Sequence, residues 1–493
     1  MARAPFVAIR FDMAAEGAPG RDAIVARVAA EIAAGRLPAG SRMPPVRVLA
    51  HQLGISKNTV SAAYDELAAR GLIVSSERDG VFVAAPPAPA AAGSQAARRP
   101  PARAALRGAT VSQRPAQEPG VIHLSSVFID PDLLPRDRLA DCVRSVLGSP
   151  GLKPYYDDQG YPPLREAIAA RLTARGMDVR TDDVVLTSGS QQALDMICRA
   201  LVTRRIATES PAYAIGKQLF ESYDLEYTGL PIDPFGGLDL DAWERALRAA
   251  RPSVFYGITS FQNPTGYSYA THELMRLLDW SAELGFGLVE DDWGSDMLSH
   301  SEYRPTLRAL GGRSVLYANS FTKKLLPALR IGFLAGDEES VPALVAAKRV
   351  ATLGNPALIE AALFEFLDRG YYDTHLASMQ EALDRKYALC LERLRAKMPE
   401  GVRWTMPGGG PVLWLELPPE VSVEALRSRC LKEGVLIDSS APAFTGPPHL
   451  NGFRLGYAQP KAEALERGIE ILGREIDRER EAVSAVRTAG GHR

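Results

Sequence analysis

Residues 183–202 read DVVLTSGSQQALDMICRALV: a short apolar run, a Ser-Gly turn and a longer amphipathic stretch. Three further runs, PSVFYGITS (252–260), GFGLVEDDW (285–293) and SVLYANS (314–320), are equally rich in β-branched and aromatic residues. Longer helical patterns follow most of them. This alternation predicts an α/β fold with a mostly parallel sheet and helices on both faces.

The composition excludes several classes of protein. The chain has 493 residues, 46% of them hydrophobic and 24% charged, which is typical of a globular protein with several domains. It has no apolar run long enough to span a membrane and no apolar leader, and its four cysteines are scattered. We therefore expect a cytoplasmic protein without disulfides. The seven histidines lack metal-ligand spacing, so no metal site is expected.

The chain divides into four predicted segments. Residues 1–84 form a first domain, and residues 85–119, rich in Pro, Ala and Arg, form a flexible linker. Residues 120–475 form the body, and residues 476–493 form a charged tail. Residues 1–119 hold fifteen Lys and Arg against nine Asp and Glu, whereas the whole chain has a net charge of −2. This asymmetry indicates a nucleic-acid contact near the N-terminus.

A helix-turn-helix pattern lies in the first domain. Helical patterns at 46–53 and 57–70 flank Gly54-Ile55-Ser56, in which glycine permits a turn and serine can cap the second helix. The runs LIVSS and VFVA then predict a two-stranded wing. A protein-binding domain is the alternative interpretation. Donors suited to DNA phosphates or base edges are Arg47, Lys57, Asn58, Thr59 and Ser61.

The stretch GRLPAGSRMPPVRVLAHQLGISKNTVSAAYDELAARGLI, with its wing, resembles the winged helix of the GntR family of bacterial regulators. This resemblance covers residues 24–83 and implies binding of double-stranded DNA. It places Arg47, Ser56, Lys57, Thr59 and Gly80 where family members meet DNA. The wing departs from the family pattern, because only Gly80 remains of its usual two glycines and Asp79 precedes it.

Four constellations in the body point to one cofactor. Ser190 and Gln191, in TSGSQQALD, would open a helix whose N–H groups attract a phosphate. Asn263, in SFQNPTG, offers an amide to a ligand oxygen, and the acids of GLVEDDW end a buried strand. In NSFTKKLLPALRIG, Lys323 can form a Schiff base and Arg330 can hold a phosphate. Pyridoxal 5′-phosphate needs this whole set of groups.

The order of these motifs resembles that of the fold-type I, aspartate aminotransferase-like family over about residues 120–475. The resemblance implies an additional smaller C-terminal α+β part. It makes Lys323 the Schiff-base lysine and Asp291 the partner of the pyridine nitrogen, with Asp292 as the alternative. Arg454, in NGFRLGYA, would hold the carboxylate of a ligand. The remaining cofactor contacts that the resemblance implies are Ser190, Gln191, Tyr213, Asn263, Trp293, Ser320, Arg330 and, toward a partner subunit, Tyr155.

A winged helix, a linker and an aminotransferase-like body together resemble the MocR subfamily of GntR regulators. Trp293 departs from the tyrosine usual in this subfamily, and Asn263 is closer to true aminotransferases. Lys324, beside Lys323, leaves open which amine bonds the cofactor.

The resemblance implies a homodimeric transcription regulator that is not primarily an enzyme. It would sense a small amino compound, or pyridoxal 5′-phosphate itself, through an aldimine at Lys323, with slow side transamination possible. The alternative is an aminotransferase for a small amino acid with a vestigial DNA-binding domain. The motifs do not specify the effector, the operator or the sign of regulation.

Overall fold

The computed structural model describes residues 6–7, 19–76, 79–85, 120–149, 157–297 and 304–490. They fall into two compact units that divide after residue 107, and each unit is described by itself. Most of the predicted linker, at 86–119, lies outside the described residues. Within the described part of the chain, no helix has the length and apolar character needed to cross a membrane.

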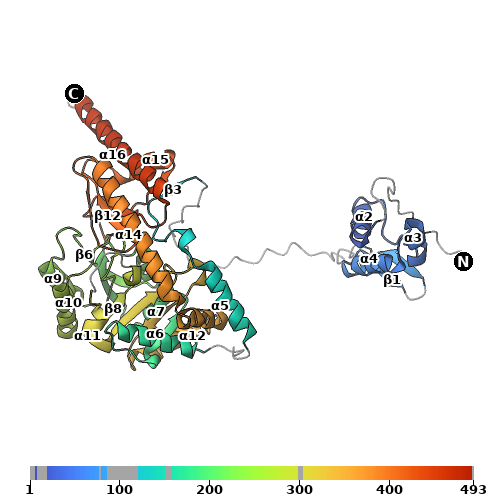
Figure 1. Ribbon diagram of the computed structural model, residues 1–493, viewed down its shortest axis with the longest axis horizontal. Helices are drawn as coiled ribbons and strands as arrows, with labels where there is room; N and C mark the ends of the chain where they lie inside the picture. The colour runs from blue at the N-terminus through green and yellow to red at the C-terminus, as the bar shows by residue number, and fades with distance from the viewer. Residues whose placement is uncertain are drawn as a thin grey trace, which may run out of the picture. The chain divides into compact units, whose positions relative to one another are not determined.

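The first unit is a small winged helix (Figure 1). Gly54 ends the first helix of the predicted motif in the left-handed conformation, with φ 63°, and the next helix begins directly after Ser56. Ile24, Leu49, Val60 and their neighbours form its core. The predicted helices and the antiparallel wing are thus confirmed. The elements are α2 (Arg21–Ala33), α3 (Val46–Leu53), α4 (Lys57–Ala69), β1 (Ile73–Ser76) and β2 (Gly80–Val83).

The second unit is built on a seven-stranded sheet in the order β4-β10-β9-β8-β7-β5-β6. All neighbouring strands are parallel except β10, which runs antiparallel to β4 and β9. The predicted α/β fold with a mostly parallel sheet is therefore confirmed. The strands are β4 (Val184–Thr187), β5 (Arg205–Ser210), β6 (Glu226–Pro231), β7 (Val254–Gly257), β8 (Gly287–Asp291), β9 (Val315–Ser320) and β10 (Gly332–Ala335).

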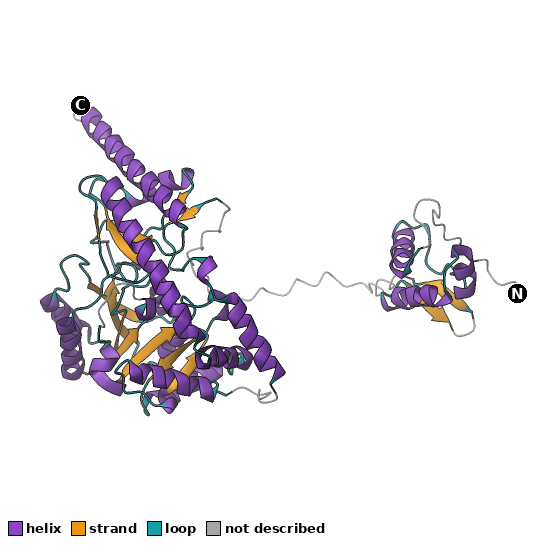
Figure 2. Ribbon diagram, in the orientation of Figure 1, coloured by secondary structure: helices purple, strands orange, loops and turns teal. Residues whose placement is uncertain are grey.

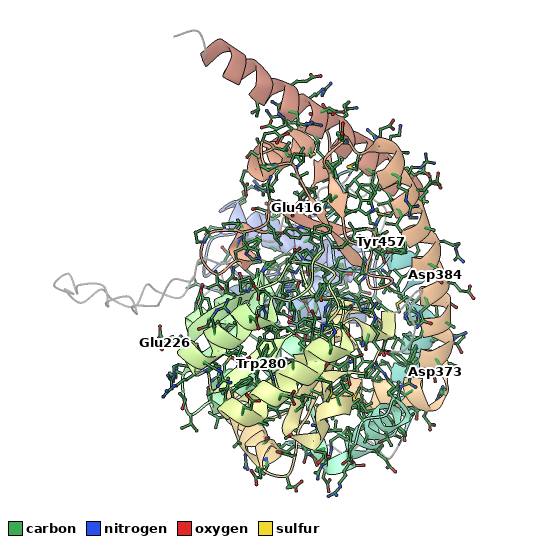
Figure 3. All side chains as sticks on the ribbon, turned by 90° about the vertical axis from the view of Figure 1, so that its left-hand side faces the viewer. Glu226, Trp280, Asp373, Asp384, Glu416 and Tyr457 are labelled. Carbon is green, nitrogen blue, oxygen red and sulfur yellow. The ribbon has the colours of Figure 1, made fainter. Side chains whose placement is uncertain are left out.

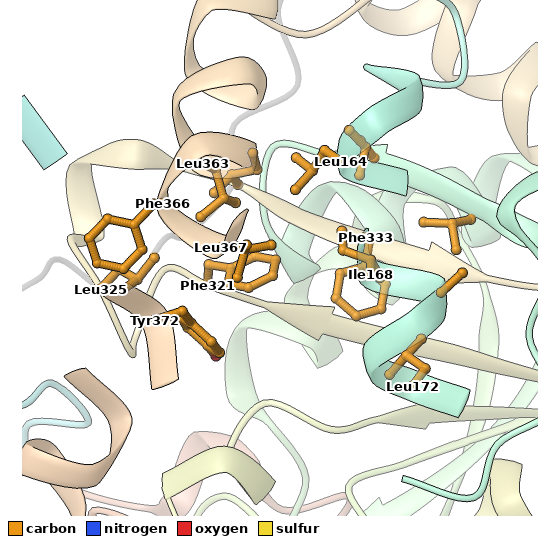
Figure 4. Packing of buried hydrophobic residues seen from close by; sticks show 14 of the residues in the cluster. Leu164, Ile168, Leu172, Phe321, Leu325, Phe333, Leu363, Phe366, Leu367 and Tyr372 are labelled. Atoms are coloured by element: carbon orange, nitrogen blue, oxygen red, sulfur yellow. The ribbon is translucent and has the colours of Figure 1, made fainter. Parts of the chain in front are cut away.

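Helices cover both faces of this sheet (Figure 2). Successive residues of a strand point to opposite faces. Val185 therefore packs with α7 and α12, whereas Leu186 and Phe333 pack with α6 and α13 in the core shown in Figure 4. Trp280, labelled in Figure 3, packs on the strands from α10. The helices are α5 (Arg136–Gly148), α6 (Pro162–Ala174), α7 (Ser190–Ala200), α8 (Ala214–Ser222), α9 (Leu240–Ala250), α10 (Thr271–Leu284), α11 (Leu307–Gly311), α12 (Ser340–Thr352) and α13 (Ala357–Asp368).

A smaller part completes the second unit. The long helix α14 begins in the core of the large sheet, where Tyr372 is buried. It continues into a second core with the smaller sheets, where Tyr387 packs with Tyr457. This is the predicted smaller α+β part. Its elements are β3 (Ile122–His123), α14 (Tyr371–Lys397), β11 (Arg403–Trp404), β12 (Val412–Glu416), α15 (Val423–Lys432), β13 (Val435–Leu436), β14 (Gly452–Gly456) and α16 (Ala462–Gly490).

The boundary predicted at residue 475 is wrong. Residues 476–490 are not a separate tail but continue α16 without a break. Ile476 is fully buried in the smaller core, and Glu479 is buried beside Arg429. The charged composition concealed the buried side of the helix, on which Ile476 and Glu479 follow Leu472 at a spacing of about one turn.

Candidate functional site

The recognition helix α4 presents polar side chains at its first turn. Ser56 Oγ accepts a hydrogen bond from the backbone N–H of Thr59 at 3.1 Å and shares another with Thr59 Oγ1 at 2.8 Å. The Ser56 hydroxyl therefore caps the helix, and the Thr59 hydroxyl is hydrogen-bonded to it. Lys57, Asn58 and Ser61 are exposed. The predicted DNA contacts thus divide into a capping pair and three side chains accessible to a ligand.

Two other predicted contacts lie outside α4. Arg47 is exposed in the first turn of α3, and Gly80 opens β2 with φ +108°. A side chain at Gly80 would be strained, and its Cβ would lie 3.4 Å from Arg42 Nε. Our sequence reasoning missed Arg42, which pairs with Phe82 of the wing through an isolated bridge. The motif gives no signal for Arg42, because its position depends on strand pairing.

In the second unit, Gly332 brings three chain segments together. It pairs with Thr187 at the end of β4 and with Ser320 at the end of β9. A Cβ at Gly332 would lie 2.9 Å from the Cα of Gly189. The absence of a side chain therefore lets the turn after β4 approach the turn after β9. Ligands in open α/β sheets bind at this carboxyl edge.

The N-terminus of α7 forms an anion cradle at this edge. Gly189, with φ +91°, precedes the helix, and no side chain caps it. Arg330 Nη2 donates to the Ser188 carbonyl at 2.9 Å, and a Cβ at Gly189 would lie 3.0 Å from that nitrogen. The predicted residues Ser190 and Gln191 open the helix. Uncapped N–H groups and a guanidinium together suit a phosphate.

Ser320 differs from the other predicted members of this cradle. Its hydroxyl donates to the Ile331 carbonyl at 3.2 Å and accepts from the Thr322 N–H at 3.1 Å. Ser320 therefore shapes the turn that carries Lys323. The neighbouring Thr322 Oγ1 is buried and has no hydrogen-bond partner in the described structure.

The two aspartates that end β8 have different surroundings. Asp291 Oδ2 accepts from Tyr256 OH at 2.8 Å, while its Oδ1 is buried without a partner. Burial raises the pKa of Asp291 to about 6, although the bond from Tyr256 opposes the rise. Asp292 accepts from Tyr317 and Ser295 instead. Of the two, only Asp291 has an oxygen available to a ligand.

The two adjacent lysines also differ. Lys324 is fully buried, and its Nζ donates to Asp296 Oδ2 at 2.9 Å and to Asn319 Oδ1 at 2.6 Å. Lys323 is half-buried, with its Nζ 3.8 Å from the centroid of the Phe128 ring. A reaction at Lys324 would first have to break a buried ion pair. Lys323 is the better placed amine.

Arg454 and Asn263 contact each other directly. Arg454 Nη1 donates to Asn263 Oδ1 at 2.7 Å, and its Nε and Nη2 donate to the Ser125 carbonyl at 3.1 and 2.6 Å. Burial lowers the pKa of Arg454 from its ordinary value, with Asp438 opposing. Among the described residues, no carboxylate forms an ion pair with this guanidinium. A ligand carboxylate would supply the missing counter-charge.

Aromatic side chains lie beside these groups. Trp293 is buried among Ile129, Ile258 and other apolar residues, and its indole N–H donates to the Phe261 carbonyl at 3.2 Å. Tyr213 packs against the same cluster. Trp293 therefore packs in this apolar cluster with its only polar atom hydrogen-bonded. Tyr155 lies outside the described residues.

These groups fit a phosphorylated pyridine aldehyde. Three buried polar atoms have no partner in the described structure: Asp291 Oδ1 at the end of β8, Gln191 Oε1 in the first turn of α7, and Thr322 Oγ1 just after β9. An anion cradle and an amine accompany them. Across the described parts of the chain, no group of three His, Cys, Asp or Glu side chains is placed to hold a metal ion.

Comparisons with known proteins agree with both halves of this description. The family model "Aminotransferase class I and II" matches residues 132–472, and "Bacterial regulatory proteins, gntR family" matches residues 21–83. The 2-aminoadipate transaminase of Thermus thermophilus is 33% identical over 73% of this chain and 91% of its own length. The probable rhizopine catabolism regulatory protein MocR of Rhizobium meliloti is 28% identical over 90% of this chain and 91% of its own.

A solved structure shares the fold of the second unit. The α-aminoadipate aminotransferase LysN of Thermus thermophilus, complexed with N-(5′-phosphopyridoxyl)-L-leucine, superposes with a TM-score of 0.69 at 32% identity. The match covers 74% of this chain and 94% of that one. The chain belongs to the aminotransferase class I and II family and, with its GntR winged helix, to the MocR subfamily of transcription regulators.

Proposed function

We propose that this protein binds operator DNA through its winged helix and senses a small amino compound through pyridoxal 5′-phosphate held in its second unit. The observation that carries the proposal is the buried, unpartnered Oδ1 of Asp291, which ends β8 of the sheet whose strand β4 leads into the anion cradle of Arg330. The pyridine nitrogen of bound pyridoxal 5′-phosphate would pair with Asp291, and its phosphate would pair with the cradle. Because the chain carries a DNA-binding winged helix, we expect binding of the amino compound to change transcription.

Each residue has a defined task in this proposal. Pyridoxal 5′-phosphate supplies an aldehyde that condenses reversibly with primary amines. Lys323 provides the resident amine, and Asp291 pairs with the ring nitrogen. The N-terminus of α7, with Arg330, would hold the phosphate, and the Asn263 amide would donate to the ring oxygen. In this proposal Tyr213 would stack on the ring, and Tyr155 would reach it from the partner subunit of a homodimer.

Arg454 links ligand binding to the DNA-binding half. Its guanidinium now holds the Ser125 carbonyl, which lies only six residues beyond the predicted linker. A ligand carboxylate would compete for these donors, because bidentate binding of a carboxylate uses two of them. The segment that continues the linker would then lose one of its contacts, while the pairing of β3 with β13 would remain. We infer that the effector carries an amine for the cofactor and a carboxylate for Arg454.

The cofactor assignment has a direct test. Full-length protein loaded with pyridoxal 5′-phosphate is reduced with borohydride, digested and analysed by mass spectrometry. We expect the phosphopyridoxyl group on Lys323, and Lys323→Ala should remain unlabelled while Lys324→Met still carries the label. Labelling of Lys324 in the wild-type protein would reverse the assignment.

The regulatory half needs a separate test. Affinity for a selected genomic DNA fragment is measured with the loaded protein, with and without a panel of amino acids. We expect at least one amino acid that changes both the visible absorption of the bound cofactor and DNA affinity. If every amine that alters the absorption leaves DNA affinity unchanged, the sensing mechanism is wrong.

An aminotransferase is the second candidate function. The contact between Asn263 and Arg454 supports it, as does the Thermus thermophilus transaminase at 33% identity. We propose slow transamination as a side activity of a cytoplasmic regulator. Sustained turnover of an amino acid with a 2-oxo acid, together with no selective DNA binding, would favour the enzyme instead.

A further inference from the structure

Lys324 is a buried cation for which the proposed chemistry has no use. A buried ammonium group is costly unless it is paired and hydrogen-bonded. Here the pairing is complete, with Asp296 Oδ2 at 2.9 Å and Asn319 Oδ1 at 2.6 Å. A residue next to the reactive lysine that is satisfied so fully needs an explanation of its own.

The hydrogen bonds of Lys324 belong to a closed ring of side chains. Asn319 donates to Tyr317 OH at 2.9 Å, and Tyr317 donates to Asp292. Arg175 donates to Ser295 Oγ at 2.7 Å and to Asp296 Oδ1 at 2.9 Å. Ser295 donates to Asp292, which closes the circuit. We call this the Lys324 ring, and its members are Arg175, Asp292, Ser295, Asp296, Tyr317, Asn319 and Lys324.

The charges of the ring balance. Lys324 and Arg175 are cations, while Asp292 and Asp296 are anions. Burial would raise the pKa of Asp296, but the charges of Lys324 and Arg175 outweigh it and hold that pKa below its usual range. Counted by the ordinary charges of these side chains, the ring is neutral. Loss of one cation would leave a net negative charge in a buried site.

Asp291 lies directly beside this ring. The negative charge of Asp292 favours protonation of Asp291, and the positive charge of Lys324 opposes it. Without the positive charge of Lys324, a larger fraction of Asp291 would be protonated. A neutral carboxyl group cannot provide the negative charge that holds a protonated ring nitrogen.

The ring is also anchored to α14. Tyr372 OH donates to Asp296 Oδ2 at 2.9 Å, and His375 Nε2 lies 2.6 Å from the carbonyl oxygen of Lys324. Figure 4 shows Tyr372 beside Phe321 and Leu325, which flank the turn, and the two aromatic rings meet edge to face at 5.5 Å. The turn that presents Lys323 is thus fixed to a helix that continues into the smaller part of the unit.

We propose that Lys324 is a positioning residue: it supplies the buried positive charge of the Lys324 ring, beside Asp291, that favours the carboxylate form of Asp291 for the cofactor. This inference rests on the proposed cofactor site. It assigns opposite tasks to two adjacent lysines, one chemical and one electrostatic. Lys324 itself touches neither cofactor nor ligand in this proposal.

The test compares the dissociation constant of pyridoxal 5′-phosphate among full-length variants. Lys324→Met removes the charge at similar length, Asp296→Asn removes the opposite charge, and the double variant restores neutrality. Exposed Lys432→Met serves as the control. We expect Lys324→Met to bind the cofactor at least about tenfold more weakly. The double variant should return to within about threefold of wild type, and Asp296→Asn should bind no more weakly than wild type.

Three results would overturn the proposal. The first is a Lys324→Met affinity within threefold of wild type, and the second is a double variant as weak as Lys324→Met. If Lys324→Met does not fold, Asp296→Asn decides, and a tenfold loss in that variant is the third. A purely structural role would weaken both single variants alike. If the wild-type protein binds no cofactor at all, the proposed function itself fails, whereas failure of the inference leaves wild-type binding intact.

Discussion

Asp291→Asn should stabilise the protein without cofactor while abolishing its use of the cofactor. Burial raises the pKa of Asp291 from 3.8 to about 6, so its ionised form is disfavoured in the folded state. A shift of roughly two units corresponds to about 3 kcal/mol of lost stability at pH 7.5. Asparagine avoids this penalty and still accepts the hydrogen bond from Tyr256. We therefore expect a gain of up to about 3 kcal/mol in the free energy of unfolding.

The pH dependence gives the sign of the effect. Because the folded pKa is raised, the penalty is absent below about pH 4 and grows as the pH rises through 6. At pH 5 the gain should shrink to roughly half its value at pH 7.5. Urea unfolding followed by tryptophan fluorescence reports on the second unit alone, because all five tryptophans lie after residue 119.

The neighbouring aspartate is the matched control. Asp292→Asn removes a carboxylate that accepts from Tyr317 and Ser295 and lies 3.6 Å from Arg175. It should lower stability, since a buried cation loses part of its counter-charge. If Asp291→Asn leaves apo stability unchanged or lowers it at pH 7.5, or if its gain does not depend on pH, our account of Asp291 is wrong.

Three further changes test other parts of the site. Arg454→Gln should weaken binding of amino acids by at least about tenfold but leave amines without a carboxylate unaffected, as measured by spectral titration. Gly189→Ala should lower the free energy of unfolding by about 1 kcal/mol or more, because φ is +91° and Arg330 lies against the new Cβ. The affinity for the cofactor should fall as well. An unchanged affinity would contradict the assignment of the anion cradle. Lys57→Ala should weaken DNA binding at every sequence and reduce the slope of log affinity against log salt by about one, whereas an unchanged slope would remove Lys57 from the phosphate contacts.

Local signals in the sequence predicted much of the fold. Gly54 and Ser56 define the turn and the cap of the recognition helix within three residues, so short-range chemistry was sufficient. The apolar runs that form β4, β7, β8 and β9 likewise indicate a parallel sheet. The antiparallel strand β10 was not predicted. It pairs with β9 and also with β4, which lies more than a hundred residues earlier in the chain.

In the candidate site, too, local motifs predict some features, while others depend on distant contacts. The motifs indicate Lys323 and Asp291, but which lysine and which aspartate face a ligand depends on distant partners. Lys324 is engaged by Asp296 and Asn319, contacts that no spacing rule predicts. The bond between Arg454 and Asn263 spans 191 positions. The prediction of a separate tail after residue 475 was wrong for a related reason, since a helix with many charges can still bury one face.

The most direct test of the central claim is sequencing of the genomic DNA fragments retained by the purified, cofactor-loaded protein, with the Lys57→Ala variant as a comparison. Our account predicts a few strongly enriched sites that the variant loses, and release of these fragments or a change in their affinity when an effective amino acid is added. Retention without sequence preference by a fully loaded protein would contradict the account and favour the aminotransferase.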